Sequence, residues 1–369
     1  RLVRGERIYH TSDGVSWTEL AGAPTAVSVA VTGNHLLINN SSATMTLLND
    51  KMELMERRII PSMDIEYDVD NQLFWLAGVD QGVISAKPNG TSPELSYYKP
   101  MGPANNFPYS ITFAGYKLLM VPGGRATDGY YRPGVVMIYQ NGQWKNIYAA
   151  DFLNQLRQQV PGQNANDFLN IAVNPTDPSH FFVTTFGYGL FEFRNDQFHK
   201  WHNHTNSPLL NVINSTPYMY IRVDGAIFDQ EGNLWLCNMF DANAIKILTK
   251  EGQWKTLNYP NSTHPTLGNI LINNQNPKQK WLNSVRYSQG ILIWDDNGTL
   301  DDKSDDKSTF LNKFPDVDNV GSELRPAFFY SMAQDKNGVV WVGTDIGPLL
   351  FYNTSRAFDP GYTCSRVKI

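Results

Sequence analysis

The chain has 369 residues, of which 41% are hydrophobic, 12% are aromatic and only 18% are charged, with a net charge of −5. This composition can build a large core and excludes an intrinsically disordered protein, and the acidic balance removes the cationic surface on which nucleic-acid binding depends. The longest apolar runs, such as "KLLMV" at 117–121, fall far short of the roughly 18 residues of a membrane-spanning helix, so we expect no transmembrane segment.

The first predicted strands lie in "RIYHTSDGVSWTEL", residues 7–20, where a polar turn separates two extended segments. The same order of polar turn, aromatic residue and alternating strand returns in "NGQWKNI" at 141–147, "RNDQFHKWH" at 194–202 and "EGQWKTL" at 251–257. Gly favours the tight bend, and the aromatic residue after it can cover the outer part of a core. Each segment predicts the turn from a third to a fourth antiparallel strand.

A second repeated pattern predicts inner hairpins. "DQEGNLWL" at 229–236 and "DKNGVVWV" at 335–342 begin with Asp, have Gly three residues later and place Trp seventh. In a variant, "IAVNPTDPSHFFVTT" at 171–185 superposes without a gap on "ILINNQNPKQKWLNS" at 270–284. Asp favours the first turn position and Gly supplies the left-handed conformation, so each segment predicts strand, tight turn and strand.

Seven inner hairpins follow one another along the chain, about 51 residues apart on average. Their central residues are Leu37, Trp75, Leu119, Phe182, Trp235, Trp281 and Trp341. The apolar alternation has the period of two of a strand, which disfavours helical repeats. Repeated four-stranded sheets close economically around a central channel. We therefore predict an all-β fold, a β-propeller of four-stranded blades.

The segment "GGRATDGYYRPG" at 123–134 is an insertion where other blades have a short turn. Arg125 and Arg132 are planar cations, and Tyr130 and Tyr131 offer rigid aromatic surface. These residue types dominate recognition sites, so we predict that the four residues bind a sugar, an anionic glycolipid or a protein partner. The alternative is that the tyrosines only pack the loop onto its own blade.

One stretch is predicted to be helical: "DFLNQLRQQV" at 151–160. Phe152, Leu156 and Val160 share one face, and Pro161 ends the pattern. We interpret this helix as an excursion between two blades.

A histidine cluster, His199, His202 and His204, lies in "FHKWHNH". His202 and His204 would share one face of an extended strand, which a metal site could use. The segment coincides with a predicted fourth strand and its exit loop, so we favour a structural role and predict no metal site.

The segment "DDNGTLDDKSDDKS" at 295–308 holds six Asp residues, a composition that attracts calcium. It lacks the Gly and Glu positions of an EF-hand loop. We interpret it as an exposed acidic loop and predict no cofactor, with calcium bound at 295–306 as the minority alternative.

No Gly-x-Ser-x-Gly elbow occurs, and neither Cys237 nor Cys364 has the surroundings of a nucleophile. Cys237, within "LWLCNM", is predicted to be a small buried residue, and the two cysteines could pair. Because propeller glycosidases and lyases take their carboxylates from different blades, the sequence leaves that class open. We predict that the protein is not an enzyme.

The end of the chain complicates a simple ring. "PLLFY" at 348–352 is predicted to be a third strand, after which "YTCSRVKI" at 362–369 leaves as another extended segment. Either the ring closes with redundancy, or the chain begins in one propeller and breaks off in the next.

The signatures "DKNGVVWVGTDIGPLLFY" at 335–352 and "DQEGNLWLCN" at 229–238 resemble the two-component-regulator propeller repeat. Such repeats occur in periplasmic sensor regions of hybrid histidine kinases and in PorZ-like surface proteins of the type IX secretion system, both in Bacteroidota. "GGRATDGYYRPGVVMIYQNGQW" at 123–144, "NSPLL" at 206–210 and "NGTLDDKSDDKS" at 297–308 are more similar to the PorZ-like group.

This resemblance implies two seven-bladed propellers followed by a β-sandwich, with a role in handling secreted cargo and anionic lipopolysaccharide. On that analogy residues 1–100 are blades at the end of a first propeller, "PMGPANN" at 100–106 is a linker, and 107–369 are blades of a second, incomplete propeller.

The resemblance further implies a non-enzymatic binding protein in the periplasm or on the outer-membrane surface of a Gram-negative bacterium. Its expected partner is a surface glycolipid or a secretion-system protein. The alternatives are the periplasmic sensor region of a hybrid histidine kinase and a carbohydrate-active propeller enzyme.

Overall fold

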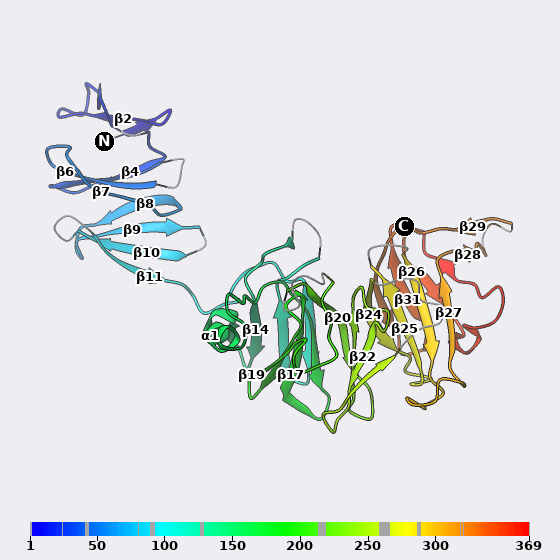
Figure 1. The fold of residues 1–369 in the computed structure, drawn as a ribbon. Helices are drawn as coiled ribbons and strands as arrows, with labels where there is room; N and C mark the ends of the chain where they lie inside the picture. The colour runs from blue at the N-terminus through cyan, green and yellow to red at the C-terminus, as the bar shows by residue number, and fades with distance from the viewer. Residues whose placement is uncertain are drawn as a thin grey trace. The chain divides into compact units, whose positions relative to one another are not determined.

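The computed structural model describes residues 2–23, 25–40, 44–79, 81–88, 93–125, 129–212, 219–257, 266–285, 289–317, 319 and 321–368. The chain forms two compact units, Arg1–Met101 and Gly102–Ile369 (Figure 1). The described residues of both units fold mainly into antiparallel sheets whose strands follow one another in chain order. The predicted all-β fold, a β-propeller of four-stranded blades, is confirmed.

The first unit contains a three-stranded sheet and two four-stranded sheets among its described residues. The strands of the three-stranded sheet are β1 (Leu2–Arg4), β2 (Arg7–His10) and β3 (Thr18–Glu19). The first four-stranded sheet contains β4 (Ser28–Val31), β5 (His35–Asn39), β6 (Thr44–Asn49) and β7 (Leu54–Ile59), and the second contains β8 (Ser62–Asp68), β9 (Leu73–Gly78), β10 (Gly82–Lys87) and β11 (Glu94–Tyr98).

The second unit contains five meanders of four strands each, which we call blades A to E, and a short hairpin among its described residues. The second and third blades are joined by strand pairing into one eight-stranded sheet. Blade A contains β12 (Ser110–Ala114), β13 (Lys117–Val121), β14 (Val135–Gln140) and β15 (Gln143–Tyr148); helix α1 (Ala149–Gln159) follows it. Blade B contains β16 (Phe168–Asn174), β17 (Asp177–Gly187), β18 (Leu190–Arg194) and β19 (Gln197–His202), and blade C contains β20 (Ile221–Phe228), β21 (Leu234–Asn238), β22 (Ile245–Leu248) and β23 (Trp254–Leu257).

The rest of the second unit continues the same meander. Blade D contains β24 (Leu267–Ile272), β25 (Gln279–Ser284), β26 (Gly290–Asp295) and β27 (Lys307–Leu311). The hairpin β28 (Phe314–Pro315) and β29 (Glu323–Leu324) leads to blade E, which contains β30 (Phe329–Gln334), β31 (Val340–Thr344), β32 (Leu349–Phe351) and, after the 3₁₀ helix η2 (Thr354–Arg356), β33 (Ser365–Arg366).

The seven residues predicted at the centres of the inner hairpins all lie on the second strand of a four-stranded meander. They are Leu37 on β5, Trp75 on β9, Leu119 on β13, Phe182 on β17, Trp235 on β21, Trp281 on β25 and Trp341 on β31. The period-two pattern therefore predicted both the blades and the position of each residue within its blade.

Hydrophobic cores lie between successive blades, because alternate residues of a strand point to opposite faces of its sheet. On β21, Trp235 packs toward blade D, whereas its neighbours Leu234 and Leu236 pack toward blade B. The large indole of Trp281 is fully buried between blades D and E. Full burial of each such side chain contributes on the order of 2–3 kcal/mol.

The predicted helix is confirmed, although it begins two residues before the predicted start. Phe152 and Leu156 are buried in the core between blades A and B, and Val160 follows the last helical residue. The ring of Phe152 stacks on Phe198 of blade B at 4.3 Å between centroids. Helix α1 therefore fixes blade A against blade B.

The repeated polar turns within 141–147, 194–202 and 251–257 connect third to fourth strands, as predicted. The turn within 7–20 instead connects β2 to β3, the second and third strands of the described three-stranded sheet. Asn141 (φ 51°) and Gly142 (φ +78°) both adopt the left-handed conformation between β14 and β15, as a tight type I′ hairpin requires. The following aromatic residue, Trp144, packs on Tyr139 at 5.1 Å.

The final segment of the chain differs from its prediction. Ser365 pairs with Leu350 and Arg366 with Leu349, so β33 is the fourth strand of blade E. The prediction that "YTCSRVKI" leaves the blade was wrong, because the short η2 turn brings this segment back alongside β32. No helix in the described part of the chain is long and apolar enough to cross a membrane.

Candidate functional site

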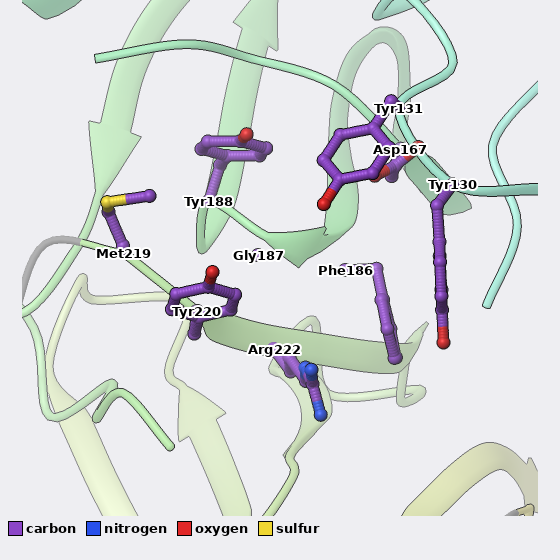
Figure 2. A pocket seen from close by; sticks show the side chains of 9 residues that line it. All are labelled: Tyr130, Tyr131, Asp167, Phe186, Gly187, Tyr188, Met219, Tyr220 and Arg222. Atoms are coloured by element: carbon purple, nitrogen blue, oxygen red, sulfur yellow. The ribbon is translucent and has the colours of Figure 1, made fainter. Parts of the chain in front are cut away.

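One face of the second unit carries a pocket of about 280 Å³, which we call the tyrosine pocket (Figure 2). It is lined by Tyr130, Tyr131, Asp167, Phe186, Gly187, Tyr188, Met219, Tyr220 and Arg222. These residues come from blades A, B and C, at the edge where first strands begin and second strands end. The pocket is therefore assembled from three consecutive blades.

Pairing between two blades sets the floor of the pocket. The end of β17 in blade B pairs with the start of β20 in blade C, which places Phe186 opposite Arg222 and Gly187 opposite Ile221. The indole Nε1 of Trp201 donates to the carbonyl oxygen of Tyr188 at 2.6 Å, which fixes the next turn. Blades B and C are thus joined at the point where they supply pocket residues.

The aromatic walls of the pocket pack on one another. The rings of Tyr130 and Phe186 are stacked with centroids 5.6 Å apart, and Tyr131 meets Tyr130 edge-on at 6.4 Å. The guanidinium of Arg222 lies over the ring of Phe186 at 4.5 Å. Stacking of this kind holds the side chains in place before a ligand arrives, so less ordering entropy is lost on binding.

Three residues of the pocket have left-handed backbone conformations that bulky residues rarely adopt. They are Tyr131 (φ 62°), Asp167 (φ 53°) and Tyr220 (φ 58°). Such conformations persist only where the surroundings enforce them, and they gather at functional sites.

Asp167 ties the loop of blade A to blade B. Its carboxylate accepts the backbone N–H of Arg132 at 2.8 Å, its own N–H donates to the carbonyl oxygen of Arg132, and its carbonyl accepts the N–H of Phe186. Burial raises the pKa of Asp167, although the backbone N–H groups of Arg132 and Tyr131 and the charge of Arg132 oppose the shift. Burial likewise raises the pKa of the neighbouring Tyr188 phenol.

Of the four residues predicted to bind a ligand, Tyr130 and Tyr131 line the pocket. Tyr130 is half-buried against Phe186, whereas Tyr131 is 79% exposed. Residues 126–128 of the same loop lie outside the described residues.

The two predicted arginines make contacts within the protein. Arg125 Nη1 lies 2.7 Å from Oδ2 of the buried Asp224, and Arg125 Nε donates to Tyr109 Oη at 2.7 Å. Burial alone would lower the pKa of Arg125, but the charge of Asp224 and the interaction with Tyr109 together outweigh it, and the pKa is raised. Arg132 Nη1 donates to the carbonyl oxygen of Pro122 at 2.8 Å, and its guanidinium lies over Phe107.

The histidine segment contributes His199 and His202 to a separate cavity of about 340 Å³. His202 Nε2 lies 2.9 Å from one oxygen of the buried Glu192, and His180 Nε2 lies 3.1 Å from the other. Arg194 Nε donates to the same carboxylate at 2.8 Å. Within the described residues, no group of three His, Cys, Asp or Glu side chains could hold a metal ion.

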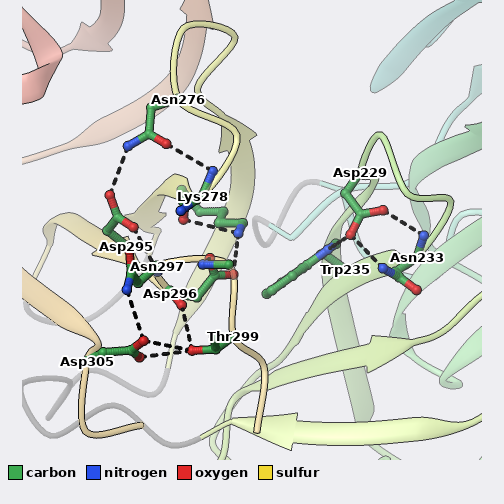
Figure 3. Close-up of polar contacts among 12 residues, drawn as sticks. Asp229, Asn233, Trp235, Asn276, Lys278, Asp295, Asp296, Asn297, Thr299 and Asp305 are labelled. Carbon is green, nitrogen blue, oxygen red and sulfur yellow. Dashed lines mark hydrogen bonds and ion pairs between the residues drawn. The ribbon is translucent and has the colours of Figure 1, made fainter. Parts of the chain in front are cut away.

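The acidic loop uses several of its carboxylates internally (Figure 3). Asp295 accepts hydrogen bonds from Asn276 and from the backbone of Asn297, and Asp305 accepts from Thr299 at 2.9 Å. Asp296 pairs with the buried ammonium of Lys280. Calcium binding by this loop remains a minority prediction.

Both cysteines are buried and free. Cys237 is fully buried within blade C, as predicted, and burial raises its pKa well above the ordinary range. Cys237 is therefore a packing residue in the core.

The blades and their closely packed faces define a β-propeller protein. Residues 323–345, from β29 through β31, match the family model described as "Two component regulator propeller". No curated protein matches the chain in sequence.

The fold is similar to that of PorZ, an essential bacterial surface component of the type-IX secretion system of Porphyromonas gingivalis from the human oral microbiome. The match has a TM-score of 0.74 and 24% identity, and covers 98% of this chain and 48% of PorZ. A weaker match to the extracellular domain of BT4673 from B. thetaiotaomicron has a TM-score of 0.46 and 15% identity, and covers 96% of this chain and 45% of that one. The chain thus spans about half the length of these two structures.

Proposed function

We propose that this chain is part of a non-enzymatic binding protein of the bacterial cell envelope, and that the tyrosine pocket holds a surface glycolipid or a secretion partner. The pocket itself carries the proposal, because three blades converge on an aromatic recess that is packed in advance. The left-handed backbone of Tyr131, Asp167 and Tyr220 supports it, since such strain accompanies functional sites.

The polar groups of the pocket suit binding better than proton transfer. The carboxylate of Asp167 is engaged by the backbone of the neighbouring loop. The guanidinium of Arg222 lies 4.5 Å from the ring centre of Phe186 and brings a positive charge to the pocket wall. Anionic lipopolysaccharide combines sugar rings with negatively charged groups.

The similarity in fold to PorZ, a bacterial surface component of a secretion system, supports an extracytoplasmic location for this chain. We place it in the periplasm or at the outer-membrane surface of a Gram-negative bacterium. Its expected partner is a surface glycolipid or a secretion-system protein.

We also propose that the two units belong to two propellers, with residues 1–100 in the first and 107–369 in the second. The outermost blades of the second unit expose aromatic and aliphatic side chains: Ile111 (53% exposed) and Phe113 (78%) on blade A, and Phe328 (50%) and Tyr330 (58%) beside blade E. Inner blades bury both faces against neighbours. Further blades packed on these faces would bury this surface.

The proposed function is tested by the affinity of the purified chain for anionic lipopolysaccharide. We expect Tyr131→Ala to weaken binding about tenfold, because the exposed ring supplies aromatic contact area. The matched control is Tyr116→Ala, which removes a ring that is 69% exposed outside the pocket. Equal affinity of wild type and Tyr131→Ala would show that lipopolysaccharide does not bind in the tyrosine pocket.

A sensor region of a histidine kinase is the second candidate, favoured by the match of residues 323–345 to the two component regulator propeller. Reading the coding sequence beyond both ends of this chain separates the two. A transmembrane segment followed by a kinase domain would favour the sensor, whereas more blades and a β-sandwich would favour the secretion component.

A further inference from the structure

We infer that the cavity between blades B and C, which we call the basic cavity, binds a phosphate monoester carried on an apolar group. Its volume of about 340 Å³ lies within the usual range of ligand pockets, roughly 300 to 1,000 Å³. Among the described residues it shares none with the tyrosine pocket, and the two lie at opposite ends of β20, which supplies Phe228 to the basic cavity and Arg222 to the tyrosine pocket. The inference therefore does not rest on the proposed function.

Blade B gives the basic cavity a mainly polar wall. Alternate residues of a strand share one face of a sheet, and here that face of β17, β18 and β19 turns toward blade C. Its polar members are His180, Glu192, Arg194, Lys200 and His202. Packing between blades favours apolar side chains, so a wall of this composition indicates a role beyond packing.

The carboxylate of Glu192 is already engaged within this wall. Asn174 Nδ2 lies 3.2 Å from Nδ1 of His180, which leaves the Nε2–H of that ring to donate to Glu192. His202 and Arg194 supply the other two contacts with this carboxylate. Glu192 is the one carboxylate among the described residues that line the cavity, and its charge is balanced by these partners. It therefore does not repel an anion that enters.

A bulge in β19 brings two neighbouring residues to the cavity. Lys200 pairs with Glu192 and Phe198 with Phe193, so His199 is the extra residue between the two pairs. Bulges of this kind re-aim side chains, and accordingly His199 and Lys200 both line the cavity although they are consecutive in a strand. Within the described part of the chain, the exposed ammonium of Lys200 has no hydrogen-bond or ion-pair partner. It is available to a ligand.

The charge of the lining favours a dianion. Three permanent cations, Arg194, Lys200 and Lys250, line the cavity against the single carboxylate of Glu192. Lys250 lies 4.0 Å from its neighbour Glu251, and both side chains are exposed, so this pair is weak. A phosphate monoester carries nearly two negative charges at neutral pH and offers three acceptor oxygens, whereas a carboxylate or a sulfate ester carries one charge. Lysine binds phosphate well as a point charge.

Blade C gives the cavity an apolar wall. Phe228, Leu248 and Trp254 line it and are half-buried, so part of each side chain is accessible. The same three side chains pack against the core between blades B and C, which holds them in place. An apolar or aromatic group of a ligand can therefore lie on Trp254 while its phosphate meets the cations of blade B.

The test is titration of the intact chain with phenyl phosphate, phenyl sulfate and inorganic phosphate at neutral pH. We expect phenyl phosphate to bind, phenyl sulfate to bind about tenfold more weakly because it has a single charge, and inorganic phosphate about tenfold more weakly because it lacks the ring. Lys200→Gln should weaken phenyl phosphate binding about tenfold.

Lys307→Gln is the matched control and should bind phenyl phosphate as the wild type does. Lys307 is an exposed lysine on β27, the fourth strand of blade D, and lies outside the cavity. Trp254→Leu is a second cavity variant, which should weaken binding of phenyl phosphate but not of inorganic phosphate. Thermal unfolding of all three variants checks their folding.

Vesicles distinguish the two sources of such a phosphate. Binding to phosphatidylcholine vesicles that contain phosphatidic acid, lost in Lys200→Gln and absent with phosphatidylcholine alone, would identify a lipid headgroup. Binding of phenyl phosphate without binding of these vesicles would identify a soluble ester.

Three results would overturn the inference: no binding of phenyl phosphate, equal binding by the wild type and Lys200→Gln, or equal binding of phenyl phosphate and phenyl sulfate. Equal binding of phenyl phosphate and inorganic phosphate would overturn the apolar group. Tyr131→Ala should bind phenyl phosphate as the wild type does, so failure at either site leaves the test of the other intact.

Discussion

At the scale of single residues, a side-chain hydrogen bond ties turn to strand in the inner hairpins of blades C and E. Trp235 Nε1 donates to Asp229 Oδ2 at 2.7 Å, and Trp341 Nε1 donates to Asp335 Oδ2 at 3.2 Å. The first indole is 2% exposed and the second 39% exposed. The Asp–Trp hydrogen bond should therefore contribute more to the free energy of unfolding in blade C than in blade E.

We expect Trp235→Phe to lower the free energy of unfolding by about 2–3 kcal/mol, because it removes a buried hydrogen bond to a carboxylate and leaves space in the core. Trp341→Phe, at the corresponding position, should cost less than about 1 kcal/mol. Urea unfolding of both variants measures the difference. Equal costs would show that the Asp–Trp bond does not depend on burial.

Glu192 should make stability depend on pH. Burial alone would raise the pKa of Glu192, but hydrogen bonds from His180, His202 and Arg194 outweigh it and lower the pKa well below the ordinary value. A depressed carboxylate pKa contributes stability above the unfolded-state pKa and loses it as the pH falls. We therefore expect the wild type to lose stability progressively as the pH falls below about 5.

Glu192→Gln should be less stable at neutral pH and should show a flatter profile across that range, as followed by thermal unfolding. Glu251→Gln, at an exposed glutamate, is the control and should keep the wild-type slope. If stability fell with pH as steeply in Glu192→Gln as in the wild type, groups other than Glu192 would cause the acid sensitivity.

Residue types alone identified only part of the candidate site. Tyr130 and Tyr131 stood out because they lie side by side in an insertion, and both line the pocket. Phe186 and Arg222 were missed because they become neighbours only through the pairing of β17 with β20, two strands from different blades. A period-two pattern locates strands but does not show which blades join at their ends.

At the scale of elements, Arg125 connects the loop between β13 and β14 to β20 of blade C. Its partner Asp224 is 1% exposed, so loss of the guanidinium would leave a buried carboxylate uncompensated. We expect Arg125→Ala to cost about 3–5 kcal/mol in chemical unfolding. The double variant Arg125→Met, Asp224→Leu should cost less than the sum of the two single variants. Normal stability with lost ligand binding in Arg125→Ala would instead make Arg125 a binding residue.

The acidic loop between β26 and β27 leads to a prediction about metal removal. Its carboxylates accept hydrogen bonds from Asn276, Thr299 and the backbone of Asn297. Because these donors already hold the loop, we expect EDTA and added calcium to leave the melting temperature unchanged. A rise of several degrees with calcium would establish the loop as a calcium site.

Blade positions were predictable because each blade repeats the same local chemistry. The Asp and Gly of a turn and an aromatic residue on the second strand act within one hairpin, so their order in the sequence is sufficient. The return of β33 to blade E was not predictable in this way. It depends on Asn353, which precedes η2 with φ 50°, and on packing of Phe351 against Tyr362 at 5.9 Å.

At the scale of the whole molecule, the described residues form separate cores in the two units. Ile65 and Phe74 belong to the core between the two four-stranded sheets of the first unit, while Phe168 and Phe191 belong to the core between blades A and B of the second. Each unit therefore buries its own apolar surface, which is the condition for a unit that unfolds by itself.

We expect two transitions in calorimetry of the intact chain, with the larger enthalpy from Gly102–Ile369 because enthalpy scales with the number of ordered residues. Met101, 79% exposed, marks the accessible connection between the units. Brief digestion with a protease of broad specificity should therefore cut first near residues 99–107, as read by mass spectrometry, since exposed connecting segments open without unfolding a core. The product 102–369 should retain the higher-enthalpy transition. A single transition, together with first cuts inside the blades, would show that the two units fold as one cooperative body and would count against their assignment to separate propellers.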